Sequence, residues 1–284
     1  MPSPGLRSYV EAIPGTPLPH GILGASCTTI TDVTKDRIHE LNGVEWLGLG
    51  CCPVRDWPDP CDEPESPGDE SPGAPPVKEF CRPTAEHAAP ITVYAGAECS
   101  ALGWTYKEAR AHAEASMELG EQQALEAAFW RTKLAMEAVD LTPPEGPVHI
   151  AQGIAALEGC LAESYGGVGT LHIPAGAAAL LGCCNIVRED PDGALRTLAG
   201  NCTIIGAGYS AMNTGPGNVP AEPGTAWLYI TGPLVIRRGP VDVIPDRPGP
   251  SVNIRNNDRR VLVERTYVVG TTCTVCAIQI AVCP

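Results

Sequence analysis

The clearest hydrophobic pattern in the chain is a proline-free amphipathic segment, which predicts one long helix from Tyr106 to Val139. Thr105-Tyr106-Lys107-Glu108 is a capping box, in which the threonine hydroxyl accepts from the third helical amide and the glutamate reaches back to the cap. Strong helix formers dominate the segment. At ~1.5 Å per residue, the helix is roughly 50 Å long. The predicted apolar face comprises Ala109, Ala113, Met117, Ala124, Ala128 and Leu134, with Leu125 and Phe129 beside it.

The polar positions of the same segment complete this prediction. We expect its acidic residues to form a solvated face. Gly120 is the weak point, because glycine costs ~1 kcal/mol relative to alanine inside a helix. Pro143-Pro144 closes the segment. The acidic residues in question are Glu114, Glu118, Glu121 and Glu126.

The pattern after residue 146 predicts a second helix and then a series of strands. The helix starts near Pro147 and ends at Gly166-Gly167, which favours a left-handed cap. Its apolar residues lie at helical spacing: Ile150, Ile154, Leu157 and Leu161. A short alanine-rich helix is predicted from Pro174 to near Gly182, and a turn at 190–193. The predicted strands are 168–173, 186–188, 202–205, 227–230, 234–237, 241–244, 260–269 and 275–282.

The sequence before the long helix predicts two extended segments. Residues 1–34 are rich in proline and predict an arm without a core of its own. Such an arm must lie on something else, for which a neighbouring subunit is a candidate. Residues 35–98 form an excursion, with strands expected at Gly43–Gly50 and Ile91–Tyr94. Between them, Asp56–Pro76 is dense in proline and acidic residues, which predicts a solvent loop.

Composition and charge narrow the classes of function. The chain has 284 residues, 44% hydrophobic and 5% aromatic, so small and aliphatic side chains must fill its core. Its net charge of -14 argues against a protein that grips nucleic acid, which needs a basic footprint. No apolar run approaches the ~20 residues that span a bilayer. Met1–Gly5 lacks the pattern of a signal peptide, so we expect folding in a cytoplasm.

The 13 cysteines allow two interpretations. An odd number leaves at least one thiol unpaired if the others form disulfides within the chain. Cysteine is also a small hydrophobe that is readily buried. Because no signal peptide is seen and the chain is far longer than a disulfide-dependent miniprotein, we expect mostly reduced, buried thiols.

Gly206-Ala207-Gly208-Tyr209-Ser210-Ala211 matches the dinucleotide-binding fingerprint and follows a predicted strand. The fingerprint binds a pyrophosphate only if a helix begins there and points its amino end at the phosphates. The residues that follow, 212–217, are turn formers. We therefore expect a glycine-rich turn between strands rather than a cofactor site.

Cys273-Thr274-Val275-Cys276 has the spacing of redox and zinc motifs. A redox pair sits at a helix amino end, whereas this one lies in a β-branched stretch, where residues three apart point to opposite faces. The other cysteines that might complete a metal site have irregular spacing, so buried thiols are the favoured interpretation. These are Cys51, Cys52, Cys61 and Cys81.

The remaining candidates do not assemble into a catalytic pattern. Ser210 is not in a nucleophile elbow, and Asn201-Cys202-Thr203 is a glycosylation sequon without a secretory context. The six histidines are scattered, at positions 20, 39, 87, 112, 149 and 172. We therefore assign no catalytic, cofactor-binding or metal-binding residue and expect no enzyme activity and no cofactor.

The order of these elements resembles that of tailed-bacteriophage major capsid proteins, whose Hong Kong 97-type fold is shared with encapsulins. The resemblance covers nearly the whole chain and implies an α+β fold with an N-terminal arm, an extended β-hairpin loop, a peripheral domain on a long spine helix, and an axial domain. The stretch Asn256–Tyr267 resembles the strand that returns to the peripheral domain. The implied regions are 1–34 (arm), 35–98 (extended loop), 99–146 (peripheral domain with spine helix), 147–242 (axial domain) and 243–284 (return strands).

The resemblance implies a structural protein that self-assembles into the icosahedral capsid of a tailed phage and encloses double-stranded DNA without sequence-specific binding. Its expected partners are identical subunits in hexamers and pentamers, with scaffold, portal or decoration proteins as further candidates and no membrane. Assembly would occur in the host bacterial cytoplasm, and the protein would reside in the virion. An encapsulin-like compartment shell is the first alternative. A nucleotide-binding enzyme built around residues 206–211 is a second, which a helix starting at Tyr209 would favour.

Overall fold

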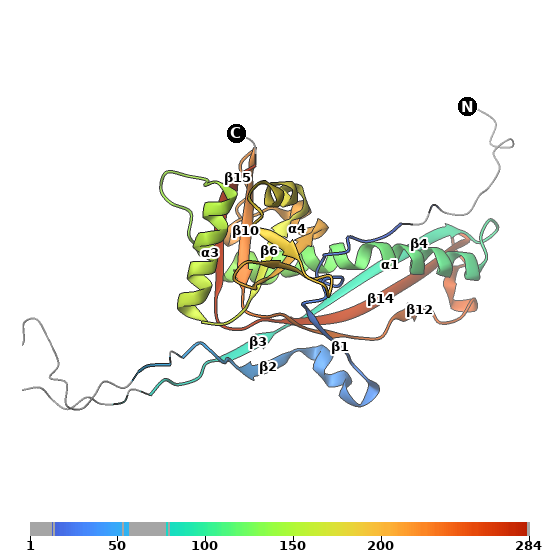
Figure 1. Cartoon of the computed structure of the whole chain (residues 1–284). Coiled ribbons are helices and arrows are strands. Elements are labelled where there is room, and N and C mark those ends of the chain that lie inside the picture. The colour runs from blue at the N-terminus through green and yellow to red at the C-terminus, as the bar shows by residue number, and fades with distance from the viewer. Residues whose placement is uncertain (1–12, 14, 53, 57–77, 79, 283–284) are drawn as a thin grey trace, which may run out of the picture.

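The computed structural model describes residues 13, 15–52, 54–56, 78 and 80–282, without the side chains of residues 183 and 184. These residues form two larger sheets and one separate hairpin, crossed by a long helix (Figure 1). The predicted loop at Asp56–Pro76 lies, from residue 57 on, outside the described residues, as do residues 1–12 of the arm. No helix of the described part is long and apolar enough to cross a membrane.

One sheet has seven strands and carries helix α3 (Ile150–Ser164) on one face. The side chains of α3 that face the sheet are those predicted from their spacing, because Ile150, Ile154, Leu157 and Leu161 are all buried. The strands, from edge to edge, are β5 (Val139–Asp140), β15 (Val275–Ala281), β10 (Thr225–Thr231), β6 (Thr170–Pro174), β9 (Cys202–Gly206), β8 (Leu195–Thr197) and β7 (Val187–Glu189).

The second sheet has six strands and is organised around β14 (Asp258–Gly270), which runs beneath the long helix (Figure 1). β4 (Pro90–Ser100) pairs with β14 along eleven positions. After residue 270 the chain passes from this sheet into the seven-stranded one through β15. The other strands are β1 (Thr29–Asp32), β11 (Val235–Arg238), β12 (Asp242–Ile244) and β13 (Val252–Asn253).

The long helix is confirmed, together with its capping box. Helix α1 spans Tyr106–Phe129, a π-helical turn η3 follows at Trp130–Leu134, and α2 (Ala135–Glu137) ends the segment two residues before the predicted end. The Thr105 hydroxyl accepts from the Glu108 amide, and the Glu108 carboxylate accepts from the Thr105 amide at 2.7 Å.

The predicted apolar face of this helix is only half right. Ala109, Ala113 and Met117 are buried, but Ala124 is exposed, and burial shifts to Leu125 and Phe129. Each residue advances ~100° around a helix, so the buried side moves to nearly the opposite face after Met117. The cause is tertiary packing: α1 contacts both β4 and β14, and it also contacts α4 (Ala207–Met212).

We expect Gly120→Ala to raise the free energy of unfolding by up to about 1 kcal/mol, because the added methyl restricts the unfolded chain and favours the helix. Gly120 lies inside α1, and a Cβ built there meets no atom within 4 Å apart from the neighbouring backbone of the helix itself. Urea unfolding of the unassembled chain, followed by circular dichroism, measures the change. A lower stability for the variant would contradict the helical setting of residue 120.

Smaller differences separate the predicted and observed elements. α3 starts three residues after Pro147, because His149 caps it by accepting from the Ala151 amide. The short alanine-rich helix is a 3₁₀ segment, η4 (Ala175–Cys184), and β8 was not predicted as a strand of its own. The other 3₁₀ segments are η2 (Lys35–Asn42), η5 (Pro216–Asn218) and η6 (Gly249–Ser251).

The second half of the predicted arm lies on its own chain. Ile22 is fully buried in the core, and β1 pairs in parallel with β11. The expectation that the arm must lie on something else therefore holds for residues 20–33, and what they lie on is their own chain. Apolar side chains alternate too irregularly there to predict this burial, and the contacts that fix the arm come from distant residues.

The excursion forms a hairpin at its base, where β2 (Val44–Leu47) pairs with β3 (Ala85–Ala88) in antiparallel fashion. Figure 1 shows this hairpin extending away from the two larger sheets. A two-stranded hairpin is marginally stable by itself, so contacts with the rest of the chain must stabilise this one.

The expectation of mostly reduced thiols is wrong. The cysteines whose side chains are described form four disulfides: Cys27–Cys202, Cys51–Cys273, Cys52–Cys81 and Cys160–Cys276. Cys99 is free among the cysteines whose side chains are described. Three of the pairs join residues more than a hundred positions apart, so no local sequence pattern identifies them.

Candidate functional site

The dinucleotide fingerprint adopts the strand and helix context that such a site needs. β9 ends at Gly206 and α4 begins at Ala207, so the predicted glycine-rich turn is wrong. The turn formers that follow act later, where Asn213 adopts a left-handed conformation and ends the helix. The question is therefore whether the amino end of α4 is open to a phosphate.

A carboxylate of the chain itself occupies that position. Glu126 of α1 accepts a hydrogen bond from the Gly208 amide at 2.8 Å through Oε2 and from the Ile22 amide at 2.9 Å through Oε1. Backbone amides at a helix amino end are the groups that would bind a pyrophosphate. Because Glu126 already takes them inside the core, the fingerprint is not a nucleotide site here.

Gly208 is required by helix packing. A Cβ at residue 208 would lie 2.2 Å from the Gln123 carbonyl oxygen and 2.6 Å from the Ala127 nitrogen, both on the backbone of α1. α4 therefore rests directly on the main chain of α1. Of the two fingerprint glycines, Gly208 serves this close approach, whereas a Cβ at Gly206 would meet the Tyr209 ring at 2.5 Å.

Glu126 corrects the predicted solvated face of α1, because its side chain is fully buried. Burial raises the pKa of this carboxyl to about 7, although hydrogen bonds from the Ile22, Gly208 and Ala207 amides oppose the shift. Gln122 acts beside it, accepting from the Leu23 amide and donating to the Leu18 carbonyl. We call Ile22, Gln122, Glu126 and Gly208 the arm junction, since they join the arm, α1 and α4.

His172 is also buried and has a structural environment. Its ring nitrogens lie 3.0 Å from the Tyr209 hydroxyl and 3.1 Å from the Thr231 hydroxyl. Burial lowers the pKa of His172 to about 3, so the ring is neutral at ordinary pH. Both ring nitrogens face hydroxyl groups in the core, so this histidine holds β6, α4 and β10 together rather than facing a substrate.

The CxxC segment does not form a pair within itself. Cys273 is bonded to Cys51 near the hairpin, and Cys276 is bonded to Cys160 on α3. The two cysteines have different partners, but strand alternation does not account for this, because Cys273 precedes β15 and adopts a left-handed conformation. Among the described residues, no group of three or more histidine, cysteine or acidic side chains is placed to hold a metal ion.

The other sequence candidates form structural hydrogen bonds with residues from other elements. Ser210 accepts from the Gly176 amide at 2.8 Å. Asn201 is buried, accepts from the Gly169 amide and donates to Glu158 at 2.8 Å. The sequon asparagine is therefore part of the packing, and no nucleophile with a base is assembled from these residues.

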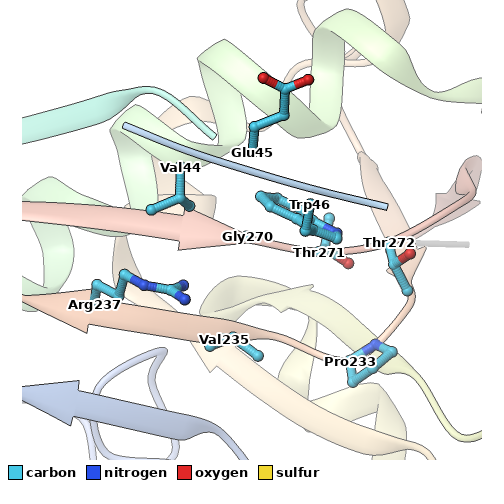
Figure 2. A pocket seen from close by; sticks show the side chains of 9 residues that line it. All are labelled: Val44, Glu45, Trp46, Pro233, Val235, Arg237, Gly270, Thr271 and Thr272. Carbon is cyan, nitrogen blue, oxygen red and sulfur yellow. The ribbon is translucent and has the colours of Figure 1, made fainter. Parts of the chain in front are cut away.

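A cavity of about 210 Å³ lies where the hairpin meets the six-stranded sheet (Figure 2). Figure 2 shows Val44 and Trp46 on the side of β2 that faces the sheet, with Glu45 on the other side. The Trp46 ring lies against Gly270, where a Cβ would be 2.9 Å from the ring. This volume is below the ~300 Å³ at which small-molecule sites begin. We therefore interpret the cavity as a gap in the packing between the hairpin and the six-stranded sheet.

The described surface of the hairpin region carries large apolar side chains that contact little of their own chain. Leu47 and Leu49 lie close in sequence on the outgoing side of the loop. Phe80 lies on the returning side, with 94% of its surface exposed. Exposed apolar side chains gathered on a projecting element are typical of an interaction surface. Neither sequence periodicity nor composition identified this surface beyond the general prediction of an extended loop.

Comparison with known proteins gives a structural likeness only. No protein-family model matches the chain, and no curated protein matches it in sequence. A solved chain of Microbacterium phage Oxtober96 matches with 10% identity and a TM-score of 0.52, covering 98% of this chain and 95% of that one. The holo-SrpI encapsulin complex of Synechococcus elongatus PCC 7942 matches with 11% identity and a TM-score of 0.51, covering 98% and 94%.

Both likenesses extend over nearly the whole of each chain, so they define the fold rather than a shared fragment. The chain is an α+β protein with the Hong Kong 97-type fold of phage capsids and encapsulins, as the order of its elements predicted. At these identities the likeness establishes the fold alone.

Proposed function

We propose that this chain is a shell-forming structural protein, the major capsid protein of a tailed phage. The observation that carries the proposal is the whole-chain likeness to a phage chain and to an encapsulin, both with TM-scores above 0.5. The described residues support it in a second way. Glu126, His172 and Ser210, which might otherwise serve a reaction, are engaged in structural hydrogen bonds. The protein acts by assembly rather than by catalysis.

In this proposal the chain divides into the regions expected from its sequence. Residues 1–34 are the arm, 35–98 the extended loop, 99–146 the peripheral domain, 147–242 the axial domain and 243–284 the return strands. Identical subunits form hexamers and pentamers, because closed symmetry repeats the same contacts. The net charge of -14 suits a wall that encloses DNA without binding its sequence. Scaffold, portal and decoration proteins are its further partners, assembly occurs in the host bacterial cytoplasm, and the shell belongs to the virion.

The exposed apolar residues of the loop give this proposal a direct test. We expect Leu47→Asp combined with Leu49→Asp to abolish particle formation, because charge replaces apolar surface that neighbouring subunits bury. Electron microscopy and light scattering of the expressed chain measure particles, and the melting temperature of the soluble chain is the control for folding. Particles of wild-type yield and shape from the folded variant would contradict a role for the loop. A wild-type chain that stays monomeric under all conditions would contradict the shell itself.

An encapsulin-like compartment is the second candidate, favoured by the TM-score of 0.51 to the SrpI encapsulin complex. The contents of purified particles separate the two. A capsid assembled in its phage contains double-stranded DNA that resists nuclease, whereas a compartment contains an enzyme as cargo. Nuclease protection and mass spectrometry of the enclosed protein measure these contents.

A further inference from the structure

Two of the disulfides meet where the extended loop leaves the body of the protein. Cys51 and Cys52 are adjacent in sequence just after β2, and their partners are Cys273 and Cys81. Cys273 lies in the crossing between β14 and β15, where the chain passes from one large sheet to the other. We call Cys51–Cys273 and Cys52–Cys81 the loop clasp, because one bond fastens the loop to the body and the other closes its base.

A wide depression of about 840 Å³ exposes this cluster to solvent. One wall is the root of the loop, with Gly50, Cys51 and Cys52, and the opposite wall is the last turn of α3 and its cap. A Cβ at Gly50 would lie 2.7 Å from the Tyr165 ring, so the root rests on that end of α3. Any rotation of the loop relative to the seven-stranded sheet changes the distance between these two walls.

The other two disulfides have a different environment. Each has one sulfur in the core, because Cys276 is fully buried and Cys202 is 3% exposed, although their partners Cys160 and Cys27 are half-buried. In the loop clasp neither sulfur is buried, since Cys51, Cys52 and Cys273 are half-buried and Cys81 is exposed. Exchange requires a thiolate to reach a disulfide sulfur, so access separates labile bonds from permanent ones. The four disulfides therefore divide into two bonds that each have one buried sulfur and two bonds at the loop that have none.

We propose that the loop clasp is a redox-modified site, opened by small-molecule thiols and closed by small-molecule disulfides, and that it fixes the loop to the seven-stranded half of the protein. In closing, a Cys51 thiolate attacks a low-molecular-mass disulfide such as oxidised glutathione and releases one thiol. The Cys273 thiolate then attacks the mixed disulfide at Cys51 and releases the second. Two protein thiols are oxidised, one disulfide is reduced to two thiols, and the two protons pass to the released thiolates.

This site gives the proposed assembly in a bacterial cytoplasm and the observed disulfides a common account. A reducing cytoplasm keeps accessible cysteines as thiols, so a chain made there has an open clasp and a loop free to adjust. An oxidising medium after release from the cell closes the clasp and locks the loop. The timing relative to assembly rests on the proposed function, whereas the chemistry of the site does not.

The first experiment measures the four disulfides separately in the full-length, unassembled chain. The oxidised protein is equilibrated with graded mixtures of reduced and oxidised glutathione, alkylated, digested and analysed by mass spectrometry. We expect both clasp disulfides to open at a reduced glutathione concentration at least tenfold lower than Cys27–Cys202 and Cys160–Cys276. Simultaneous opening of all four, earlier opening of the core pairs, or zinc retained by the clasp cysteines would each overturn the proposal.

The second experiment measures the loop itself by limited proteolysis. We expect cleavage within residues 43–56 to become about tenfold faster when the clasp of the wild-type chain is reduced. Cys51→Ser should show the fast rate with or without reductant, whereas Cys99→Ser, which removes the free thiol of β4, should behave as wild type. Equal cleavage rates for reduced and oxidised wild type would overturn the lock, and this comparison needs no variant to fold.

A third measurement separates this inference from the proposed function. Particles assembled under reducing conditions and then oxidised should lose subunits more slowly on heating than particles kept reduced or made from Cys51→Ser. Equal dissociation rates would refute an effect on the shell. Failure to form particles at all would refute the proposed function and leave the first two experiments decisive for the clasp.

Discussion

Replacing Gly208 with alanine is expected to lower the free energy of unfolding by about 3 kcal/mol or more, enough to remove most of the soluble protein. The new Cβ would lie 2.2 Å from the Gln123 carbonyl oxygen and 2.6 Å from the Ala127 nitrogen. Both atoms belong to the backbone of α1, so no side-chain rotation relieves the contact. α4 must move away from α1, and the Gly208 amide then loses its bond to Glu126.

Soluble yield and urea unfolding of the unassembled chain measure this effect. Gly176→Ala is the matched control, because a Cβ there meets only the Ser210 hydroxyl oxygen at 3.6 Å, an ordinary contact. We expect the control to unfold within about 0.5 kcal/mol of wild type. A Gly208→Ala chain as stable as this control would show that the two helices are not in direct backbone contact.

The same residue shows why a sequence motif is ambiguous. Gly208 fits the dinucleotide fingerprint by position, and the strand and helix that flank it satisfy the context test. What excludes a nucleotide is Glu126, which lies 82 positions away in sequence. A motif specifies a local backbone shape, whereas the group that the backbone faces is decided by tertiary packing.

Local interactions account for the parts of the fold that the sequence predicted. The Thr105–Glu108 capping box lies within four residues, and the buried face of α3 repeats at helical spacing over Ile150–Leu161. Both signals are complete within one element. For this reason the spine helix, α3 and most strands were predicted within a few residues of their observed bounds.

Long-range contacts account for the parts that could not be predicted. Glu126 accepts a hydrogen bond from the Ile22 amide, which lies 104 positions away in sequence. Cys51 forms a disulfide with Cys273, which lies 222 positions away. No periodicity reports on such pairs. The apolar face of α1 also changes sides after Met117, because one half of the helix lies on a sheet and the other contacts α4. A single helical period fitted to the whole segment therefore assigned Ala124 to the core and Glu126 to solvent.

The arm junction makes stability depend on pH through Glu126. Burial raises the pKa of this carboxyl to about 7, whereas its ordinary value is 4.5. Between these two values the folded chain holds a proton that the unfolded chain has released. The contribution of Glu126 to stability is therefore complete below pH 4.5 and is lost as the pH rises through 7, by about 3 kcal/mol in total.

Two neighbouring groups must be separated from this effect. Burial raises the pKa of the Tyr209 hydroxyl, and the charge of Glu126 raises it further, so this phenol stays neutral across the same range. His172 acts in the opposite direction, because burial lowers its pKa to about 3 from an ordinary 6.5. Its contribution is complete above pH 6.5 and is lost as the pH falls toward 3, so the wild-type profile alone does not isolate Glu126.

The difference between Glu126→Gln and wild type isolates the carboxyl, because His172 and Tyr209 are common to both chains. The amide cannot ionise, although it places a donor near the Ile22 and Gly208 amides and so lowers stability by a constant amount. From pH 4.5 to 8 we expect the unfolding free energy of the variant, relative to wild type, to rise by about 3 kcal/mol. Urea unfolding at intervals of half a pH unit measures the difference. Gly120→Ala changes no titratable group, so its difference from wild type should be constant across the series. An equally constant difference for Glu126→Gln would mean that the carboxylate is as readily ionised in the folded chain as in the unfolded one, and that the three amides outweigh its burial.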